Sequence, residues 1–143
     1  MSVANAAAPA QPQSLPALLD EAVTSLEALL DAARDKLRPR IVIDGRVDAA
    51  RLDAEQHAAH GLAWLATYVR ALRELAACSE RLSAEGRFGA MEEMLVRIGA
   101  GEYCAQALNG IPMSQGEILR LSAFGFDHGE IARFYPRHRC TDR

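Results

Sequence analysis

The feature of this sequence that most constrains its fold is the spacing of its apolar residues, which recur at helical intervals along almost the whole chain. From Leu15 onward they stand three or four positions apart, the spacing that places side chains on one face of an α-helix. The first stripe consists of Leu15, Leu18, Leu19, Val23, Leu26, Leu30, Ala33 and Leu37. Ser14 is suited to cap this helix, Pro16 fits its first turn, and Pro39 is expected to end it.

The second helical pattern is the longest and has the widest apolar face. It runs without interruption from Asp48, a suitable N-cap residue, to about Ala84, and Gly86 is placed to end it. Two neighbouring stripes lie on it: Leu62, Leu65, Val69, Leu72 and Ala76, beside Gly61, Trp64, Tyr68, Ala71, Leu75, Cys78 and Leu82. An apolar face this wide is typical of a helix at the centre of a bundle or in an oligomer interface.

Between these two patterns, the segment IVIDGRV departs from helical spacing. Asp44 and Gly45 stand between β-branched residues, which is a hairpin signal. An ordered loop is at least as compatible with so short a segment as a pair of strands, because an isolated hairpin is only marginally stable.

The chain beyond Gly86 is expected to hold one more long helix and one or two short ones. The apolar residues of the third long helix, over 88–108, are Phe88, Met91, Leu95, Ile98, Ala105 and Leu108. Gly99 and Gly101 weaken this helix and would be compensated by the close approach of another helix. The segment SQGE matches a capping box, which predicts a short helix over 114–121, and Asp127 can cap one last turn.

Together these patterns predict an all-α fold, an antiparallel helical bundle of three main helices with one or two short C-terminal helices. We expect a disordered tail at 1–13, the bundle domain at 14–122, and a short helix with a basic tail at 123–143. The chain has 143 residues, of which 50% are hydrophobic, so it is long enough for one domain with its own core.

Charge, hydropathy and cysteine content disfavour several classes of protein. The net charge of −3 argues against nucleic-acid binding, and the basic segment at 133–143 is more typical of a chain end than of an RNA site. No apolar run reaches the roughly 18–20 residues of a membrane helix, and the N-terminus lacks the pattern of a signal peptide. Three widely spaced cysteines fit reduced thiols. We therefore expect a cytoplasmic protein that binds neither membranes nor nucleic acid.

The segment EQHAAHGLAWLATYV holds the most suggestive cluster of side chains. His57 and His60 are close enough to share a metal ion, but a zinc site needs three or four ligands and no suitable third ligand is near. Trp64 and Tyr68 stand one helical turn apart, which is more typical of a core or an interface than of a ligand platform, and a histidine could bind a polar ring tip. The cysteines form no recognisable Cys–His arrangement. We therefore expect no metal site and no catalytic residue.

Two longer stretches, QHAAHGLAWLATYVRAL and GEYCAQALNGIPMSQGEILR, resemble the helical region that precedes the flavoprotein body in a group of bacterial acyl-CoA dehydrogenases. The resemblance covers about 15–121, and it implies that the histidine and aromatic segment packs or docks and does not catalyse. FAD and the glutamate base of that family belong to the dehydrogenase body, so no cofactor is expected in this chain. The residues expected to form a docking or interface site are His57, Trp64, Tyr68, Tyr103, Met113 and Gln115.

The resemblance implies a noncatalytic helical docking or oligomerisation module of an acyl-CoA dehydrogenase-like flavoprotein, a family of fatty acid metabolism. Its partner would be the dehydrogenase body or another copy, so a homo-oligomer is expected. Beyond Arg120 the resemblance ends, which suggests a truncated chain or a separate subunit. One alternative is a self-contained helical interaction protein that forms a homodimer through the second long helix. Another is an enzyme in its own right, but the sequence offers only the histidine pair as titratable groups for a site.

Overall fold

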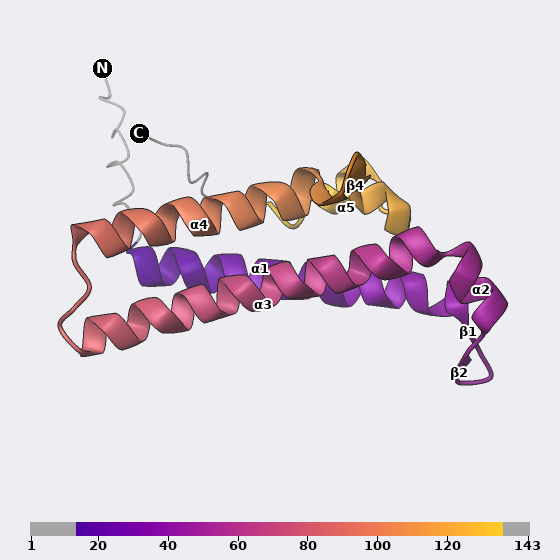
Figure 1. Ribbon diagram of the computed structural model, residues 1–143, viewed down its shortest axis with the longest axis horizontal. Coiled ribbons are helices and arrows are strands. Elements are labelled where there is room, and N and C mark those ends of the chain that lie inside the picture. The colour runs from indigo at the N-terminus through magenta and orange to yellow at the C-terminus, as the bar shows by residue number, and fades with distance from the viewer. Residues whose placement is uncertain (1–13, 136–143) are drawn as a thin grey trace, which may run out of the picture.

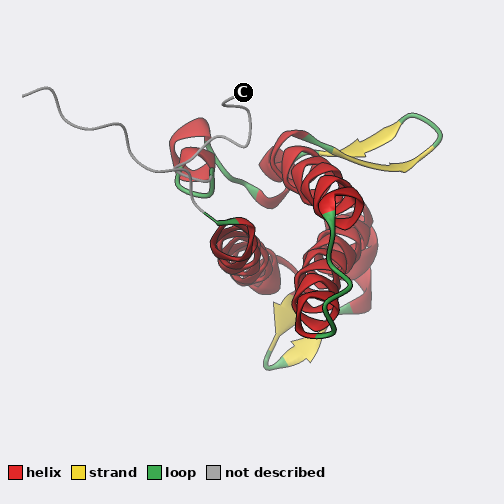
Figure 2. Ribbon diagram, turned by 90° about the vertical axis from the view of Figure 1, so that its left-hand side faces the viewer, coloured by secondary structure: helices red, strands yellow, loops and turns green. Residues whose placement is uncertain are grey.

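Three long helices lie side by side and run alternately up and down in the computed structural model, which describes residues 14–135 (Figure 1). They are α1 (Leu15–Ile41), α3 (Gln56–Ala84) and α4 (Ala90–Asn109). The shorter elements are β1 (Val42–Ile43), β2 (Arg46–Val47), α2 (Ala49–Ala54), β3 (Ile111–Ser114), β4 (Glu117–Leu119), the 3-10 turn η1 (Leu121–Phe124) and α5 (His128–Ala132). The predicted all-α bundle of three main helices is confirmed, with two small hairpins that project from different sides of it (Figure 2).

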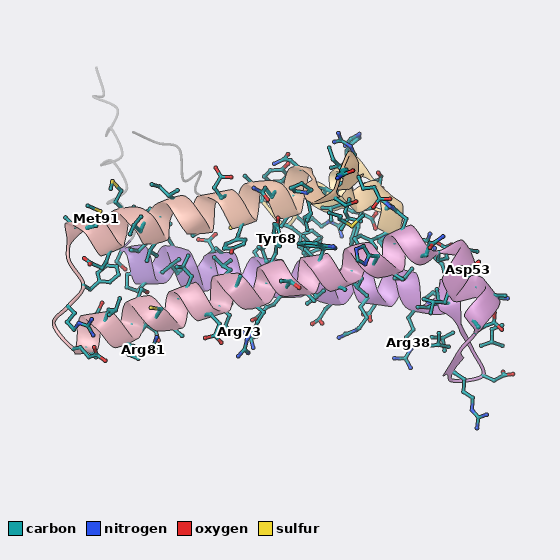
Figure 3. The ribbon with its side chains drawn as sticks, viewed as in Figure 1. Arg38, Asp53, Tyr68, Arg73, Arg81 and Met91 are labelled. Carbon is teal, nitrogen blue, oxygen red and sulfur yellow. The ribbon has the colours of Figure 1, made fainter. Side chains whose placement is uncertain are left out.

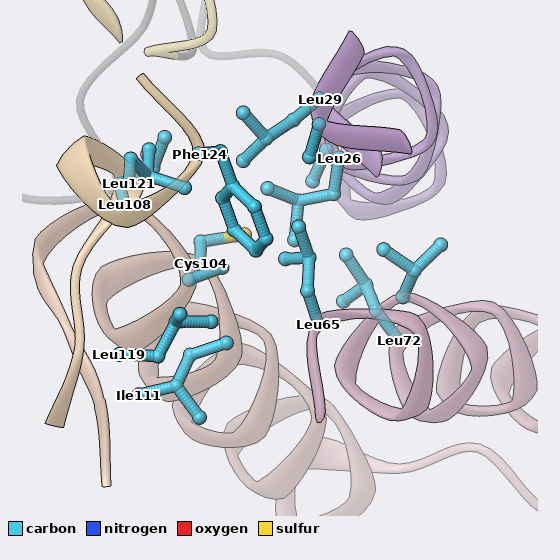
Figure 4. Close-up of a cluster of buried hydrophobic side chains, with 14 of the residues drawn as sticks. Leu26, Leu29, Leu65, Leu72, Cys104, Leu108, Ile111, Leu119, Leu121 and Phe124 are labelled. Carbon is cyan, nitrogen blue, oxygen red and sulfur yellow. The ribbon is translucent and has the colours of Figure 1, made fainter. Parts of the chain in front are cut away.

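The core fills the space between the three long helices and the segment that follows α4. Its largest fully buried side chains are Leu26, Leu29, Leu37, Leu65, Leu72, Ile111, Leu119 and Phe124. Figure 4 shows Phe124 of η1 between leucines of α1 and residues of α4 and the β3–β4 hairpin. Complete burial of a side chain of this size stabilises the fold by about 1.5–3 kcal/mol, so η1 and the hairpin are integral parts of the core.

The first helix does not end at Pro39 as expected but continues to Ile41. Proline costs most in a helix interior, where its ring meets the preceding turn and a hydrogen bond is lost. Here it stands in the last turn, and the N–H of Val42 still bonds to the carbonyl of Arg38. The half-buried Ile41 packs against the core, and this contact offsets the cost of the proline.

The segment after α1 forms a hairpin, which the sequence had left open. Val42 pairs with Val47, and Ile43 pairs with Arg46. The turn between them is made by an aspartate with φ 49° and a glycine with φ 77°, and positive φ at both positions is what a two-residue type I′ turn requires.

The second helical pattern proves to be two helices, because the chain breaks at Glu55 between α2 and α3. Asp48 caps α2 as predicted, accepting a hydrogen bond from the N–H of Arg51 at 2.9 Å. The Glu55 carboxylate forms two hydrogen bonds with Arg40 at the end of α1, and Arg40 also donates to the carbonyl of Ala123 in η1 at 2.9 Å. The break therefore lies where three separate parts of the chain are joined.

Glycines shape the end of α3 and the contact between α3 and α4. Gly86 has φ 66° and ends α3 as predicted, with the two hydrogen bonds of a Schellman motif. A Cβ at Gly99 would lie 3.2 Å from Leu75 of α3, so the expected close approach is confirmed there. A Cβ at Gly101 would have no neighbour within 4 Å, so the same expectation is wrong for Gly101.

The helix predicted over 114–121 is wrong, because this segment forms the β3–β4 hairpin. Gly116, with φ 86°, allows the tight turn. The Ser114 hydroxyl donates to Glu117 Oε2 at 3.1 Å across the turn, so the two side chains of the supposed capping box bond to each other. Alternate residues of β3 are buried and the strand contacts α3. This period of two is the one that a strand presents and a helix does not.

The last described elements close one side of the bundle. Asp127 caps α5 as predicted, accepting from the N–H of Glu130 at 2.8 Å while Glu130 accepts from the N–H of Asp127 at 3.0 Å. Lys36 of α1 forms an ion pair with Glu130 at 2.9 Å. Among the helices of 14–135, none is long and apolar enough to cross a membrane.

Candidate docking surface

The histidine pair lies at the start of α3, and both side chains are exposed. His60 Nε2 accepts a hydrogen bond from Trp64 Nε1–H at 3.0 Å, and the two rings meet edge to face with centroids 6.3 Å apart. One histidine therefore supplies the polar partner of the tryptophan ring, while His57 faces solvent. In the described part of the chain, no group of three or more His, Cys, Asp or Glu side chains could hold a metal ion.

Tyr68 and Tyr103 are brought together where α3 meets α4 (Figure 3). Their rings contact edge to face with centroids 5.2 Å apart. The Tyr68 hydroxyl donates to Gln106 Oε1 at 2.6 Å, and Gln106 Nε2 donates to Glu102 Oε2 at 3.2 Å. Burial, and next the nearby Tyr103, raise the pKa of the Tyr68 phenol, which keeps it protonated as a donor. This network fixes α4 in position on α3.

The remaining expected site residues belong to the β3–β4 hairpin and do not join the tyrosines. Met113 is buried in the core with 7% of its surface exposed. Gln115 lies at the turn and is exposed. Of the six expected docking residues, the structure thus brings two into direct contact, places Trp64 one turn before them, and leaves His57 and Gln115 on the surface.

Among residues 14–135, the longest row of exposed large apolar side chains on one helix lies on α4. We define the α4 stripe as Met91, Met94, Leu95 and Ile98, whose side chains are 60%, 49%, 58% and 56% exposed. At about 100° per residue these four side chains fall within one sector of roughly 100°. Met91 lies on the outer side of α4 in Figure 3.

The opposite face of α4 enters the core, and it carries smaller residues. Its buried residues are Val96, Ala100, Cys104, Ala107 and Leu108. The apolar stripe expected from the sequence included Met91, Leu95 and Ile98, which the structure places outside. The helix is therefore apolar on two opposite faces, and this excess of apolar residues over 88–108 is the sequence signal that could have marked the surface.

The sequence of this chain matches a known dehydrogenase over most of its length. No family model matches it. It is 47% identical over 112 residues to (2S)-methylsuccinyl-CoA dehydrogenase of Cereibacter sphaeroides, a match that covers 78% of this chain and 20% of that protein. This chain is homologous to one segment of an acyl-CoA dehydrogenase. The family resemblance of the two long sequence stretches is therefore confirmed.

The relative is much longer than this chain. The chain spans about a fifth of the length of the relative.

Proposed function

We propose that this chain is a noncatalytic helical docking or oligomerisation module of an acyl-CoA dehydrogenase-like flavoprotein. The observation that carries the proposal is the α4 stripe. A contiguous exposed apolar patch is typical of a site of protein interaction, and a helix that is apolar on opposite faces is normally covered on both. The homology with a segment of a dehydrogenase supplies the family in which such a module would work.

The titratable groups with shifted pKa values support a structural role for the described residues. Shifted pKa values often mark catalytic groups, and in 14–135 they occur at Tyr68 and Glu130. Tyr68 joins α3 to α4. The hydrogen bond from Lys36, and next the backbone hydrogen bond from Asp127, hold the pKa of Glu130 below its usual value. Burial, the contact with Lys36 and helix capping account for both shifts, so neither requires a reaction.

The family also implies FAD, and the described residues do not fit it. A hollow of about 380 Å³ lies between the end of α4 and α5, lined in part by Arg120, Asp127 and His128. Its lining includes the carboxylate of Asp127 and no glycine whose backbone amide could hold a diphosphate. In this proposal the flavin and the catalytic base belong to the four fifths of such an enzyme that this chain does not match, and no reaction step involves this chain.

The expected docking residues take different parts in this proposal. Tyr68 and Tyr103 hold α4 so that its outer stripe is presented to a partner. Gln115 and His57 are exposed and remain predicted contact residues. The partner is the dehydrogenase body or another copy of this chain.

The test is association with the remainder of (2S)-methylsuccinyl-CoA dehydrogenase, produced without the segment that this chain matches. We expect the chain to bind that protein or itself, and Leu95→Glu to abolish the binding, because it places a charge within the stripe. Ala77→Glu is the matched control, since Ala77 is exposed on α3 between Arg73 and Arg81. Helical circular dichroism and melting temperature establish that both variants fold.

Two results of this test would refute the docking role. One is a monodisperse monomer with no affinity for the enzyme. The other is Leu95→Glu binding as well as the wild type. A dimer without affinity for the dehydrogenase would favour the self-contained interaction protein.

A further inference from the structure

We propose that the α4 stripe binds the same stripe of a second copy of this chain, in an antiparallel helix pair whose two-fold axis passes beside Ile98. The inference rests on the proposed function, since the stripe must be a docking surface. It adds the occupant of that surface and the register of the contact. A two-fold pair is self-complementary, because the same patch serves on both copies.

The first observation is a gradient of side-chain size along the outer face of α4. Met91, Met94 and Leu95 in the first half are large and exposed. Gly101 and Ala105 in the second half continue the same face, since they follow Met94 and Ile98 by seven residues each. The space outside Gly101 is open, because an added Cβ would have no neighbour within 4 Å. The first half of this face therefore carries large protruding side chains, and the same face in the second half carries small ones.

Two-fold symmetry matches the half with large side chains to the half with small ones. A two-fold axis perpendicular to the helices reverses the chain direction and keeps each flank of α4 against the same flank of the second copy. With the axis beside Ile98, Met94 faces the partner's Gly101, and Met91 faces the partner's Ala105. Large side chains opposite small ones interdigitate and allow close approach. A parallel pairing would instead place methionine against methionine and leave a gap between the glycines.

The other flank sets Leu95 against the partner's Glu102. The aliphatic part of that glutamate can cover the leucine while its carboxylate stays in water. Glu93 and Arg97, which flank the stripe beside Met94, form an ion pair at 2.7 Å on the same helix. They neutralise each other beside the stripe and do not repel a second copy.

The decisive variant is Gly101→Met, studied in the full chain by analytical ultracentrifugation. The open space outside Gly101 admits the new side chain, and methionine favours a helix more than glycine does. The monomer should therefore fold at least as well as the wild type, while the second copy's Met94 is displaced. We expect the dimer to weaken about tenfold or more, as overpacking of a close contact does.

The matched double variant is Met94→Ala/Gly101→Met, which exchanges the large and small positions. It should restore the dimer to within a few fold of the wild type. Two single lysine substitutions test the two flanks of the stripe separately. Leu95→Lys would face the partner's Glu102 and keep the dimer, whereas Met94→Lys would face a glycine and break it.

The outcomes separate this inference from the proposed function. A wild-type chain that stays monomeric but binds the dehydrogenase remainder through Leu95 overturns the self-pairing and leaves the docking role. A dimer that Gly101→Met does not weaken, or that the double variant fails to restore, overturns the register. A chain that binds neither itself nor the dehydrogenase overturns both proposals.

Discussion

A methyl group added at Gly61 would overlap the side chain that anchors the β3–β4 hairpin on α3. A Cβ at Gly61 would lie 2.2 Å from Leu119 Cδ1 and 2.9 Å from Leu119 Cγ. Leu119 is only 1% exposed, so its side chain is enclosed by other core residues that a shift would disturb. Gly61→Ala therefore forces the Leu119 side chain to shift, and with it the packing of the hairpin on α3.

The size of the effect follows from two opposing terms. Overpacking a well-packed site costs about 1–3 kcal/mol, while alanine in place of glycine stabilises a helix interior by about 1 kcal/mol. The net loss should be about 0–2 kcal/mol in the free energy of unfolding. Gly101→Ala is the matched control, because it lies in open space and should gain about 1 kcal/mol.

Urea denaturation of both variants at one protein concentration measures the two values. The difference between them isolates the overpacking cost of about 1–3 kcal/mol. In a Leu119→Ala background the contact is gone, so Gly61→Ala should there become neutral or stabilising. If Gly61→Ala stabilises the otherwise wild-type chain as much as Gly101→Ala does, the close contact between α3 and the hairpin is refuted.

Three further perturbations have effects that follow from single contacts. Tyr68→Phe removes a hydrogen bond worth about 0.5–1.5 kcal/mol. Because the pKa of Tyr68 is raised, the full contribution of this bond should be present below the ordinary tyrosine pKa of about 10 and be lost as pH rises through the raised value. Chemical unfolding of the wild type and the variant across this pH range measures it. Arg40→Ala should lower the free energy of unfolding by about 1.5–3 kcal/mol, since it leaves Glu55 without its arginine partner at the α2–α3 break. A melting temperature equal to that of the wild type would contradict this. Glu130→Gln weakens the contact with Lys36. Because the pKa of Glu130 is lowered, the difference in stability between this variant and the wild type should be constant above the ordinary glutamate pKa of about 4.3 and vanish as pH falls through the lowered value. Thermal melts across that pH range measure the difference.

The sequence by itself determined the elements whose stability depends on near neighbours in the chain. Asp48 and Asp127 cap helices, and Gly86 ends one, because each acts on backbone groups within a turn of itself. The helical spacing of the apolar residues predicted three long helices for the same reason. The similarity to an acyl-CoA dehydrogenase was also readable from sequence, since the two long stretches that carried the resemblance belong to a chain that is 47% identical over 112 residues to such an enzyme.

Only the tertiary structure decided the segments whose conformation depends on remote contacts. SQGE carries the residues of a capping box, yet it forms a hairpin whose inner face packs on α3. The chain continues helically past Pro39 because Ile41 reaches the core, and it breaks at Glu55, where Arg40 binds from another helix. None of these contacts is encoded within one helical turn of the residues concerned.

The candidate docking surface shows the same limit most clearly. Periodicity identifies α4 as apolar, but it cannot choose between two apolar faces on one helix. Packing buries the face of Val96, Ala100 and Cys104, because small side chains allow α4 to approach the other helices closely. The larger side chains of the α4 stripe are left outside as a consequence. The sequence supplied both faces of α4, and the packing of the bundle decided which of them a partner can reach.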